Sequence, residues 1–509
     1  MTPRAHPDTT PPSGRSYAWP LLLLLVAALI PFWVAPLPVM TDLYGHIGRY
    51  AVMLRGQHSA WLSAYYDFHW HLVGNLGGDL IAWGLGPWIG AQGAGIIAAA
   101  LMPVLGIAGV AAVSRALHGR IQPSALAAAI FVLGNPFHFG FVNYGLAIGL
   151  AFLSFAAWIR LRDEPWWRLL IVVAPLAFIT WLAHAMGWVV LVTLVAGYEG
   201  ERWARERRWR SVAASIPPGL ALLSPLVLTL AWSGGSGSAV GLYQDHLLTR
   251  KLMGWVAMLR GGSPVIDIGT PIILGLVIGA LWWRGSVKVD KRIGLGAALL
   301  ALLCLVMPTT LMGSWAADER LVPVAVMAAL VSLRSTGRAR EGQVLAAIAI
   351  ALFLLRCGEM GVRWHREGMR YEAALKALDF VPMGARIHAV TLTDGCHAGW
   401  TTQAWSHLPD LAIDRRDALV NSQWRVLGAP LLRVRYPLPP EISNDPSEQI
   451  PAWGCGKVDL GALHRRIAIL PRGRIGYLWV LDRRGLGPIW PGHRPIYATF
   501  DTALYRVGP

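Results

Sequence analysis

The segment "YAWPLLLLLVAALIPFWVAPLPVMTDLYGHIGRYAVMLRG", from Tyr17 to Gly56, joins a long apolar run to a polar stretch. Its first part, Trp19 to Val34, approaches the ~20 apolar residues with which a helix crosses the hydrocarbon of a bilayer. The run is too long for an ordinary signal-peptide core, and no clear cleavage site follows it. We therefore expect an uncleaved first transmembrane helix, preceded by a cytoplasmic tail over residues 1–18.

The polar stretch carries an aspartate, a histidine and an arginine at steps of four and three residues. If Thr41 opens a helix, Asp42, His46 and Arg49 line one stripe of that helix. Ionisable groups beside a membrane are costly unless they face a wet cavity. This stripe is therefore the strongest indication of function in the sequence.

The composition predicts a polytopic membrane protein. Of the 509 residues, 55% are hydrophobic and only 15% are charged, and the mean hydropathy is +0.46. Apolar runs of near-spanning length recur along most of the chain. The net charge of +16 does not indicate a nucleic-acid partner, because no basic stretch carries the aromatic spacing of a binding module. Basic residues in such a protein mark cytoplasmic loops and attract anionic membrane lipid.

Arginine and lysine cluster on alternate loops, as the positive-inside rule requires. The basic loops are Ser114 to Arg120, Arg160 to Arg168, Glu201 to Arg210, Arg284 to Arg292 and Arg334 to Arg340. This alternation predicts a mainly α-helical bundle of about eleven transmembrane helices over residues 19–360. We expect the first outer loop, residues 40–92, to contain juxtamembrane helices, one of them between Leu72 and Ile89.

The tail, residues 361–509, is polar and contains short alternating runs. The runs "RIHAVTL", "RIAILP" and "GYLWVLD" predict strands. We expect a small soluble α/β or α+β domain on the outer side of the membrane. Because that compartment is oxidising, Cys396 and Cys455 are expected to form a disulfide, the alternative being two unpaired buried thiols.

The polar residues that are candidates for function fall on the loops expected outside. Asp42 is the candidate for chemistry, and other ionisable or hydrogen-bonding groups converge on the same membrane face. The candidates for substrate binding are His46, Arg49, Asp67, His69, His71, Asp79, Asn143, Tyr144, His184, Arg250, Lys251, Glu319 and Arg320.

A metal site has limited support in the sequence. No His-x-x-x-His or paired-cysteine motif indicates zinc. Asp42 with Asp67 or Asp79 offers oxygen ligands suited to Mg²⁺ or Mn²⁺ and a substrate phosphate. The chain has no GxxxxGK[ST] loop, so ATP is not an expected cofactor.

The order of these features resembles the GT-C superfamily of polytopic glycosyltransferases, especially bacterial protein O-mannosyltransferases and lipid A aminoarabinose transferases. "TDLYGHIGRYAVMLRG" is similar to the acidic start of their first outer loop, and "HWHLVGNLGGDLIAWGLG" to their second juxtamembrane helix. Glu319, Arg320, Leu321 and Pro323 are similar to a later entry into a span. Many members carry two adjacent acids in the first loop, whereas Leu43 follows Asp42 here.

The resemblance implies transfer of a sugar from a polyprenyl-phosphate donor on the outer face of the bacterial inner membrane. Asp42 would be the general base for attack by a glycan, lipid or protein acceptor. Arg320, Arg250 and Lys251 would be the cations for the phosphate leaving group. His46 would tune Asp42 or bind the sugar.

Two other functional classes stay open at this stage. A transporter or flippase of lipid-linked glycans, or an assembly partner, would share the membrane bundle, but we find no internal repeat of the kind typical of transporters. A sensor or scaffold that acts through its outer domain would tolerate alanine at the polar loop positions.

Overall fold

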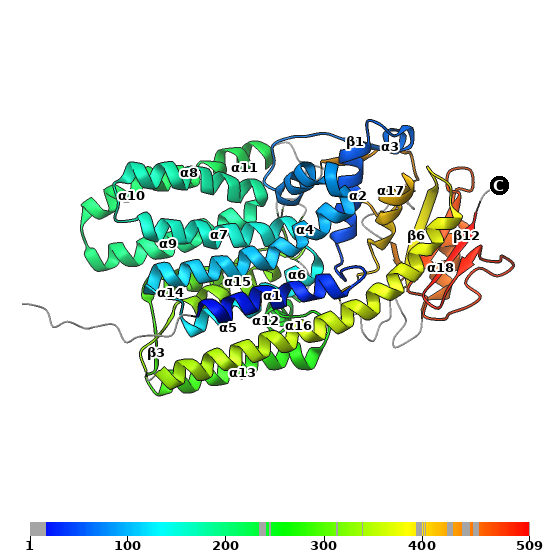
Figure 1. The fold of residues 1–509 in the computed structure, drawn as a ribbon. Helices are drawn as coiled ribbons and strands as arrows, with labels where there is room; N and C mark the ends of the chain where they lie inside the picture. Colours follow the sequence, from blue (N-terminus) through cyan, green and yellow to red (C-terminus); the bar gives the residue numbers. More distant parts are fainter. Residues whose placement is uncertain are drawn as a thin grey trace, which may run out of the picture.

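The computed structural model describes residues 17–233, 241–243, 246–311, 314–337, 339–392, 400, 402, 404–424, 431–439, 448–450 and 458–507. A bundle of long helices occupies one end of the molecule, and a sheet domain occupies the other (Figure 1). The basic turns that join α9 to α10 and α13 to β3 lie at the end of the bundle away from the sheet domain (Figure 1).

Within the described residues, six helices are long and apolar enough to cross a membrane. They are Gly77–His118, Val142–Leu161, Trp166–Ala183, Val212–Ala231, Pro264–Trp283 and Ala339–Phe380. Two shorter apolar helices, Trp19–Val34 and Pro123–Phe139, accompany them. The chain is therefore a multi-pass membrane protein, as the composition predicts, and the count of about eleven spans stays a prediction.

The helices of the bundle and of the first outer segment follow the expected order. They are α1 Ala18–Val34, α2 Leu43–Arg55, α3 Ala60–Tyr65, α4 Gly77–His118, α5 Pro123–Ala129, η1 Ile130–Leu133, α6 Asn135–Phe139, α7 Val142–Leu161, α8 Trp166–Ala183, α9 Ala185–Glu206, α10 Trp209–Leu223, α11 Pro225–Ser233, α12 Leu247–Val256, α13 Pro264–Trp283, α14 Lys291–Val306, α15 Ala317–Val331 and α16 Ala339–Leu375. Short antiparallel pairs join β2 Gly241–Leu242 to β4 Thr310–Leu311, and β3 Val287–Val289 to β5 Leu333–Ser335.

Two local features differ from the sequence expectations. α2 begins at Leu43, with Asp42 at the N-cap position rather than inside the helix. The juxtamembrane helix expected between Leu72 and Ile89 begins at Gly77 in the structure, and a kink at Gly90 separates it from the span that follows within the 42-residue α4. Gly90 has a φ of 74°, a conformation that a residue without Cβ adopts at little cost.

The C-terminal domain is a mixed six-stranded sheet in the order β11-β12-β10-β6-β7, with β9 also pairing with β6. Its strands are β6 Arg386–Leu392, β7 Leu419–Val420, β9 Glu448–Ile450, β10 Tyr477–Leu481, β11 Tyr497–Ala498 and β12 Thr502–Arg506. Its helices are η2 Lys376–Phe380, η3 Leu408–Asp410, α17 Leu411–Arg416 and α18 Leu460–Ala468. The strands expected from "RIHAVTL" and "GYLWVLD" are confirmed as β6 and β10.

The strand expected from "RIAILP" is wrong, because α18 extends into this run and ends at Ala468. The Asp459 side chain caps this helix by accepting a hydrogen bond from the Ala462 amide, and Leu463 and Ile467 are buried four residues apart. The apolar residues are therefore spaced for one face of a helix, and this spacing outweighs the alternation of apolar and polar residues that suggested a strand. The domain boundary expected at residue 361 lies within α16 and stays a prediction.

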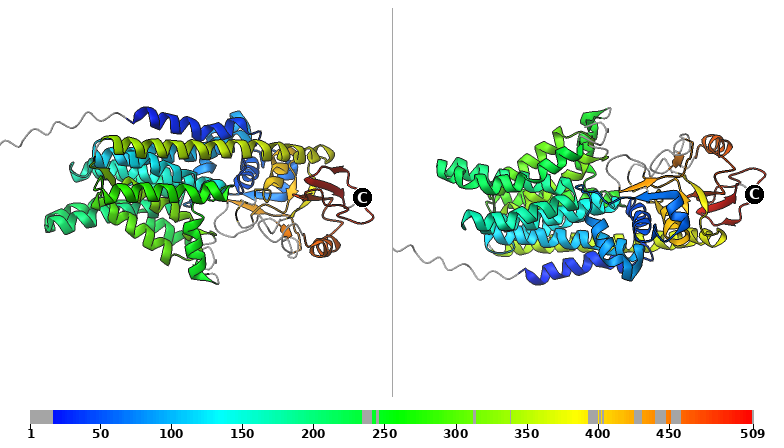
Figure 2. Two further views of the ribbon diagram at one scale, coloured as in Figure 1. Left: turned by 90° about the horizontal axis from the view of Figure 1, so that it is seen from below. Right: turned by 90° about the horizontal axis from the view of Figure 1, so that it is seen from above.

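The first outer segment lies between the bundle and the C-terminal domain (Figures 1 and 2). β1, Tyr66–Phe68, pairs with β8, Leu432–Val434, in an antiparallel ribbon. At the end of α2, the Arg55 guanidinium forms an ion pair of 2.8 Å with Asp414. α2 is therefore in contact with the C-terminal domain along its length, and the stripe that begins at Asp42 lies at this junction.

Candidate functional site

Asp42 is fixed by the turn between α6 and α7. Its backbone N–H donates a hydrogen bond of 2.8 Å to the carbonyl of Phe139, and its own carbonyl accepts from the amide of His46 at 3.1 Å. Gly140 follows Phe139 with a φ of 76°. A Cβ on Gly140 would lie 3.0 Å from the Leu43 backbone nitrogen, so this glycine permits the close approach.

Arg320 lies beside the same turn, on the first turn of α15. Its guanidinium carbon is 3.5 Å from the centre of the Phe141 ring, which is a cation–π contact. The Tyr144 hydroxyl donates a hydrogen bond of 2.7 Å to the Arg320 carbonyl. The His184 ring meets the Tyr144 ring edge-on, with the centroids 5.7 Å apart. These contacts bring three of the expected site residues together.

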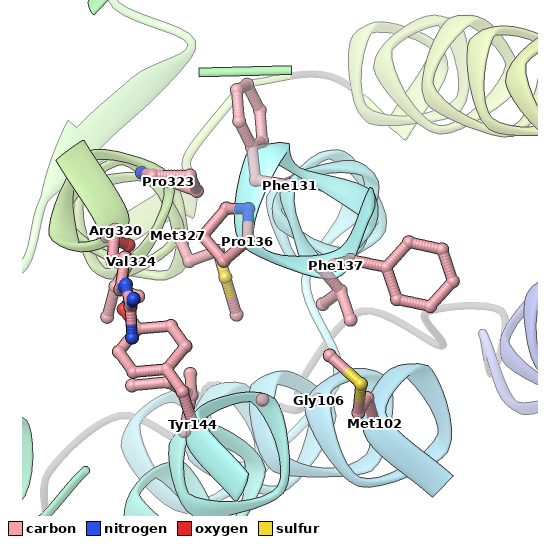
Figure 3. Close-up of a pocket in the computed structure, with 13 residues that line it drawn as sticks. Met102, Gly106, Phe131, Pro136, Phe137, Tyr144, Arg320, Pro323, Val324 and Met327 are labelled. Carbon is pink, nitrogen blue, oxygen red and sulfur yellow. The ribbon is translucent and has the colours of Figure 1, made fainter. Parts of the chain in front are cut away.

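A small cavity of about 40 Å³ opens beside Arg320. Its walls come from α4, η1, α6, α7 and α15, and Figure 3 shows Arg320 and Tyr144 side by side at one side of it. The remaining lining is almost entirely apolar, with Met102, Phe131, Pro136, Phe137, Val324 and Met327 among its residues. A cation therefore lies at the edge of an apolar chamber inside the bundle.

Asp42 and Arg320 share a property that sets them apart from the other charged candidates. Within the described part of the chain, neither side chain has a hydrogen-bond or ion-pair partner, and the Arg320 Nε is buried without an acceptor. Burial raises the pKa of Asp42 above its usual value, while His407 and Arg320 act to lower it. The two groups are thus in electrostatic contact with each other and available to a ligand.

His46 is buried one helical turn after Asp42. Burial lowers the pKa of His46 well below its usual value, and Arg49, His407 and Arg320 add to this effect. The neutral imidazole accepts a hydrogen bond of 3.1 Å at Nδ1 from the Arg49 guanidinium. His46 is therefore suited to hydrogen bonding and not to carrying charge at neutral pH.

Arg49 and Asp79 are partners of each other. Both are buried, and the guanidinium donates two hydrogen bonds of 2.8 Å to the carboxylate. Asn143 lies against this pair and links the carbonyl of Asn75 to the amide of Gly78, at 2.7 Å and 2.6 Å. This network joins α2, α4 and α7, and substrate binding by these residues stays a prediction.

Lys251, Arg250 and Glu319 also have protein partners. The ammonium of Lys251 is buried, forms an ion pair of 2.6 Å with Asp318 and donates to the carbonyl of Cys304 at 2.9 Å. The Arg250 guanidinium lies 3.8 Å from the carboxylate of Glu319. Three cations were expected to bind a phosphate: Arg320, Arg250 and Lys251. Among the described residues, Arg250 and Lys251 each have a carboxylate partner, whereas Arg320 has none.

Asp67, His69 and His71 lie on β1 and the loop that follows it. The His69 imidazole is 2.8 Å from the Asp67 carboxylate and is 73% exposed. His71 is exposed, and its ring contacts the backbone carbonyl of His69. The structure thus places this group on an exposed edge of the first outer segment.

The described residues contain no group of three or more His, Cys, Asp or Glu that could hold a metal ion. Asp79 is bound by Arg49, and Asp67 is bound by His69. The acids expected to share a Mg²⁺ or Mn²⁺ ion with Asp42 therefore have other partners. Cys396 and Cys455, the expected disulfide, lie outside the described residues.

The sequence analysis missed a polar group that the C-terminal domain brings to α2. His407, Asp410 and Ser422 form a buried chain of hydrogen bonds, and His407 acts electrostatically on Asp42. The motif "SHLPD" offered a signal, because a histidine and an aspartate three residues apart share a helix face. The tail contained several such polar pairs, and nothing local indicated which one reaches the membrane domain.

Arg260 was also missed. It follows α12, and its guanidinium carbon lies 5.7 Å from the centre of the Phe139 ring. The side chain donates a hydrogen bond of 3.0 Å to the carbonyl of Trp400. The stacked rings of Phe139 and Phe141 thus each contact an arginine guanidinium, at the turn whose Phe139 carbonyl accepts from the Asp42 amide.

No protein-family model matches the sequence, and a search of curated proteins finds no match. Among solved structures, the chain is similar to the crystal structure of ArnT from Cupriavidus metallidurans in the apo state. The TM-score is 0.52 at 10% sequence identity, and the match covers 96% of this chain and 98% of that chain. At this identity the similarity shows the fold. The fold of this chain is thus like that of ArnT, in agreement with the architecture that the sequence resemblance predicted.

Proposed function

We propose that this protein is an inner-membrane glycosyltransferase that moves a sugar from a polyprenyl-phosphate donor to an acceptor on the outer face. The observation that carries the proposal is that Asp42 and Arg320 both lie at the turn of Phe139 and Phe141, and that neither side chain has a hydrogen-bond or ion-pair partner among the described residues. The ArnT-like fold adds support at the level of architecture.

The phosphate and the apolar chain of the donor each suit a different part of this site. A phosphate group pairs well with a guanidinium, and Arg320 is stacked on Phe141 in an orientation that is already fixed. The apolar residues around the small cavity beside Arg320 would lie against the isoprene chain of the carrier next to its phosphate. The sugar would then lie between Arg320 and Asp42.

The proposed reaction is an inverting displacement at the anomeric carbon. The acceptor hydroxyl forms the new bond to this carbon while the bond to the phosphate oxygen breaks. Asp42 takes the proton of the hydroxyl as general base, and the polyprenyl phosphate leaves with both electrons of the broken bond. Arg320, with Arg260 nearby, stabilises the negative charge that develops on the phosphate. His46, as a neutral imidazole, would hydrogen-bond a sugar hydroxyl.

The test is transfer by purified protein in nanodiscs with a panel of radiolabelled polyprenyl-phosphate sugars. Wild type, Asp42→Asn and Asp67→Asn are compared, and thermal melts check that each variant is folded. Asp67 is the matched control, because it is a carboxylate of the same segment that lies on an exposed edge. We expect wild type and Asp67→Asn to release polyprenyl phosphate, and Asp42→Asn to be slower by about 10²–10⁴-fold.

Equal rates for wild type and Asp42→Asn would exclude Asp42 as the base. Binding of lipid-linked sugar by wild type without release from any donor would exclude the transferase and favour a transporter of lipid-linked glycans. Equal loss in both variants would mean that the substitutions act through the fold.

A further inference from the structure

A second cleft lies between the first outer segment and the C-terminal domain, and it shares no lining residue with the Asp42 site. Its volume is about 440 Å³, within the range of about 300–1,000 Å³ that is usual for small-molecule sites. One wall is an edge of the sheet, where Arg386 begins β6, Tyr477 begins β10 and Arg506 ends β12. The opposite wall comes from Trp61 and Tyr65 on α3.

Aromatic rings from separate segments meet in this cleft. Trp61 is 49% exposed, and its indole lies against Gly384, which has a φ of 71° and where a Cβ would overlap the ring. The Tyr65 hydroxyl donates a hydrogen bond of 2.6 Å to the Gly384 carbonyl. The Tyr65 ring meets the ring of Tyr436 edge-on, with the centroids 5.5 Å apart. These contacts hold the rings in place without a ligand.

Two arginines lie beside these rings, and among the described residues neither forms an ion pair with a carboxylate. Arg386 donates hydrogen bonds to the Tyr436 hydroxyl at 2.9 Å and to the Gly473 carbonyl at 3.3 Å, which are both neutral acceptors. Arg506 is exposed and lies opposite Tyr477 in the β10–β12 pair. The described lining contains no aspartate or glutamate. Two positive charges in the cleft are therefore available to an anion.

The surrounding part of the sheet domain is also basic. Residues 458–507 contain eight arginines and three acids. Each of these acids, Asp459, Asp482 and Asp501, already forms an ion pair with an arginine. The excess of arginines gives this region a positive potential, which attracts anionic ligands.

We propose that this cleft binds a sugar unit that carries a carboxylate or a phosphate. A sugar ring has an apolar C–H face, which suits the exposed indole of Trp61, and hydroxyl groups, which suit the polar tips of the tyrosines. A guanidinium binds a carboxylate or a phosphate through two parallel hydrogen bonds. A free inorganic anion would use the arginines but not the rings. The proposal needs no catalytic role for Asp42, so it goes beyond the proposed function.

The experiment measures sugar binding to the full chain in nanodiscs by saturation-transfer NMR. The probes are glucuronate, glucose 6-phosphate and glucose, with inorganic phosphate as a competitor. Wild type is compared with Arg506→Gln and Trp61→Ala. The matched controls are Arg472→Gln, an exposed arginine of the same domain outside the cleft, and Trp70→Ala, a 46% exposed tryptophan of the same outer segment. Thermal melts check that each variant is folded.

We expect wild type to bind at least one of the two anionic sugars about tenfold more tightly than glucose, because the guanidinium groups bind the anion. Arg506→Gln should weaken binding of that anionic sugar by about tenfold and leave glucose binding unchanged. Trp61→Ala should weaken binding of all three sugars by about tenfold, and the two controls should stay within about twofold of wild type. The comparison of glucuronate with glucose 6-phosphate shows which anion the site prefers.

No binding of any sugar, or equal affinity for glucose and both anionic sugars, would overturn the proposal. Unchanged binding in folded Arg506→Gln and Trp61→Ala would place the sugar elsewhere and overturn it too. Displacement of the anionic sugars by an equal concentration of phosphate, with no effect of Trp61→Ala, would show a simple anion site instead. If Trp61→Ala does not fold, Trp61→Leu takes its place. Because binding needs no turnover, a failure of sugar transfer would remove the proposed function and leave this result intact.

Discussion

Arg49 donates two parallel hydrogen bonds, each of 2.8 Å, to the carboxylate of Asp79, and both side chains are buried. The pair joins α2 to α4, and α2 carries Asp42 at its N-cap. The Arg49–Asp79 ion pair therefore holds α2, and with it Asp42, in place against α4. A buried ion pair is costly to break, because removal of one partner leaves the other charge without compensation.

Asp79→Asn should therefore destabilise the protein by about 3–5 kcal/mol, since the Arg49 guanidinium is left buried without its anion. The measurement is the denaturation midpoint in detergent. Asp67→Asn is the control, because exposed pairs such as Asp67 and His69 contribute only about 0–1 kcal/mol. A variant that removes both charges, Arg49→Met with Asp79→Leu, should recover much of the loss. Wild-type stability of Asp79→Asn would contradict the role of the pair as a brace.

The rate of sugar transfer should fall as the pH falls through the pKa of Asp42. A general base works only when deprotonated, and burial raises the pKa of this carboxyl above the usual value. The acid limb of kcat should therefore lie above the ordinary aspartate pKa of about 3.9. The measurement is kcat against pH with saturating donor. A rate that stays constant down to about pH 4 would show that no carboxyl with a raised pKa acts as the base.

Two substitutions of Arg320 should distinguish the effect of its positive charge on the rate from the effect of its planar guanidinium group. Arg320→Met removes the cation, and we expect kcat to fall by about 10²-fold or more, because the leaving phosphate loses its counter-charge. Arg320→Lys keeps the charge but not the planar group on Phe141, and we expect an intermediate rate.

The matched control is Arg292→Met, since Arg292 also lies over an aromatic ring, that of Tyr198, but belongs to the basic loop expected on the cytoplasmic side. Release of polyprenyl phosphate at single-turnover conditions measures the effect. Equal losses in Arg320→Met and Arg292→Met would point to a loss of stacking and not of phosphate binding.

Gly140→Ala should reduce transfer by tenfold or more while the bundle stays folded. The added Cβ would lie 3.0 Å from the Leu43 nitrogen and 3.1 Å from the Met40 Cβ, so the turn that holds Asp42 must shift. Misplacement of a reacting group by about 1 Å costs about 10²-fold in rate.

Gly119→Ala is the control for this substitution. Gly119 has a similar φ of 72°, but a Cβ there meets no atom within 4 Å. The two variants share the backbone strain, and only Gly140→Ala disturbs Asp42. The measurements are kcat and the melting temperature of each variant, and we expect only Gly140→Ala to lose kcat without a matching loss of melting temperature. Similar kcat values in both would indicate that the turn tolerates the shift.

Much of the architecture followed from the sequence alone. The apolar runs predicted the membrane helices, because transfer of a segment into hydrocarbon is favourable when its side chains are apolar and its backbone groups bond to each other within a helix. Helical periodicity predicted that Asp42, His46 and Arg49 lie along one stripe. In the structure the His46 amide donates to the Asp42 carbonyl, and the Arg49 guanidinium donates to the His46 ring. The order of these features was sufficient to indicate the ArnT-like fold.

The tertiary structure decided which of the many polar residues are free to act. Asp42 and Asp79 both lie in the expected first outer loop, yet Asp79 is bound by Arg49 from another helix. Lys251 and Arg320 differ in the same way, because Asp318 lies beside Lys251. Pairing across distant segments depends on packing, and no local pattern encodes it.

The contribution of the C-terminal domain belongs to the same class. Trp424 and Asp410 lie far from α2 in the chain, and they pack against it because Gly45 and Gly48 leave room for them. The sequence by itself determined which segments enter the membrane and which polar stripe leaves it, because those properties are local. The tertiary structure alone decided which charges of the described residues have a partner, such as Asp79 and Lys251, because ion pairs depend on long-range contacts.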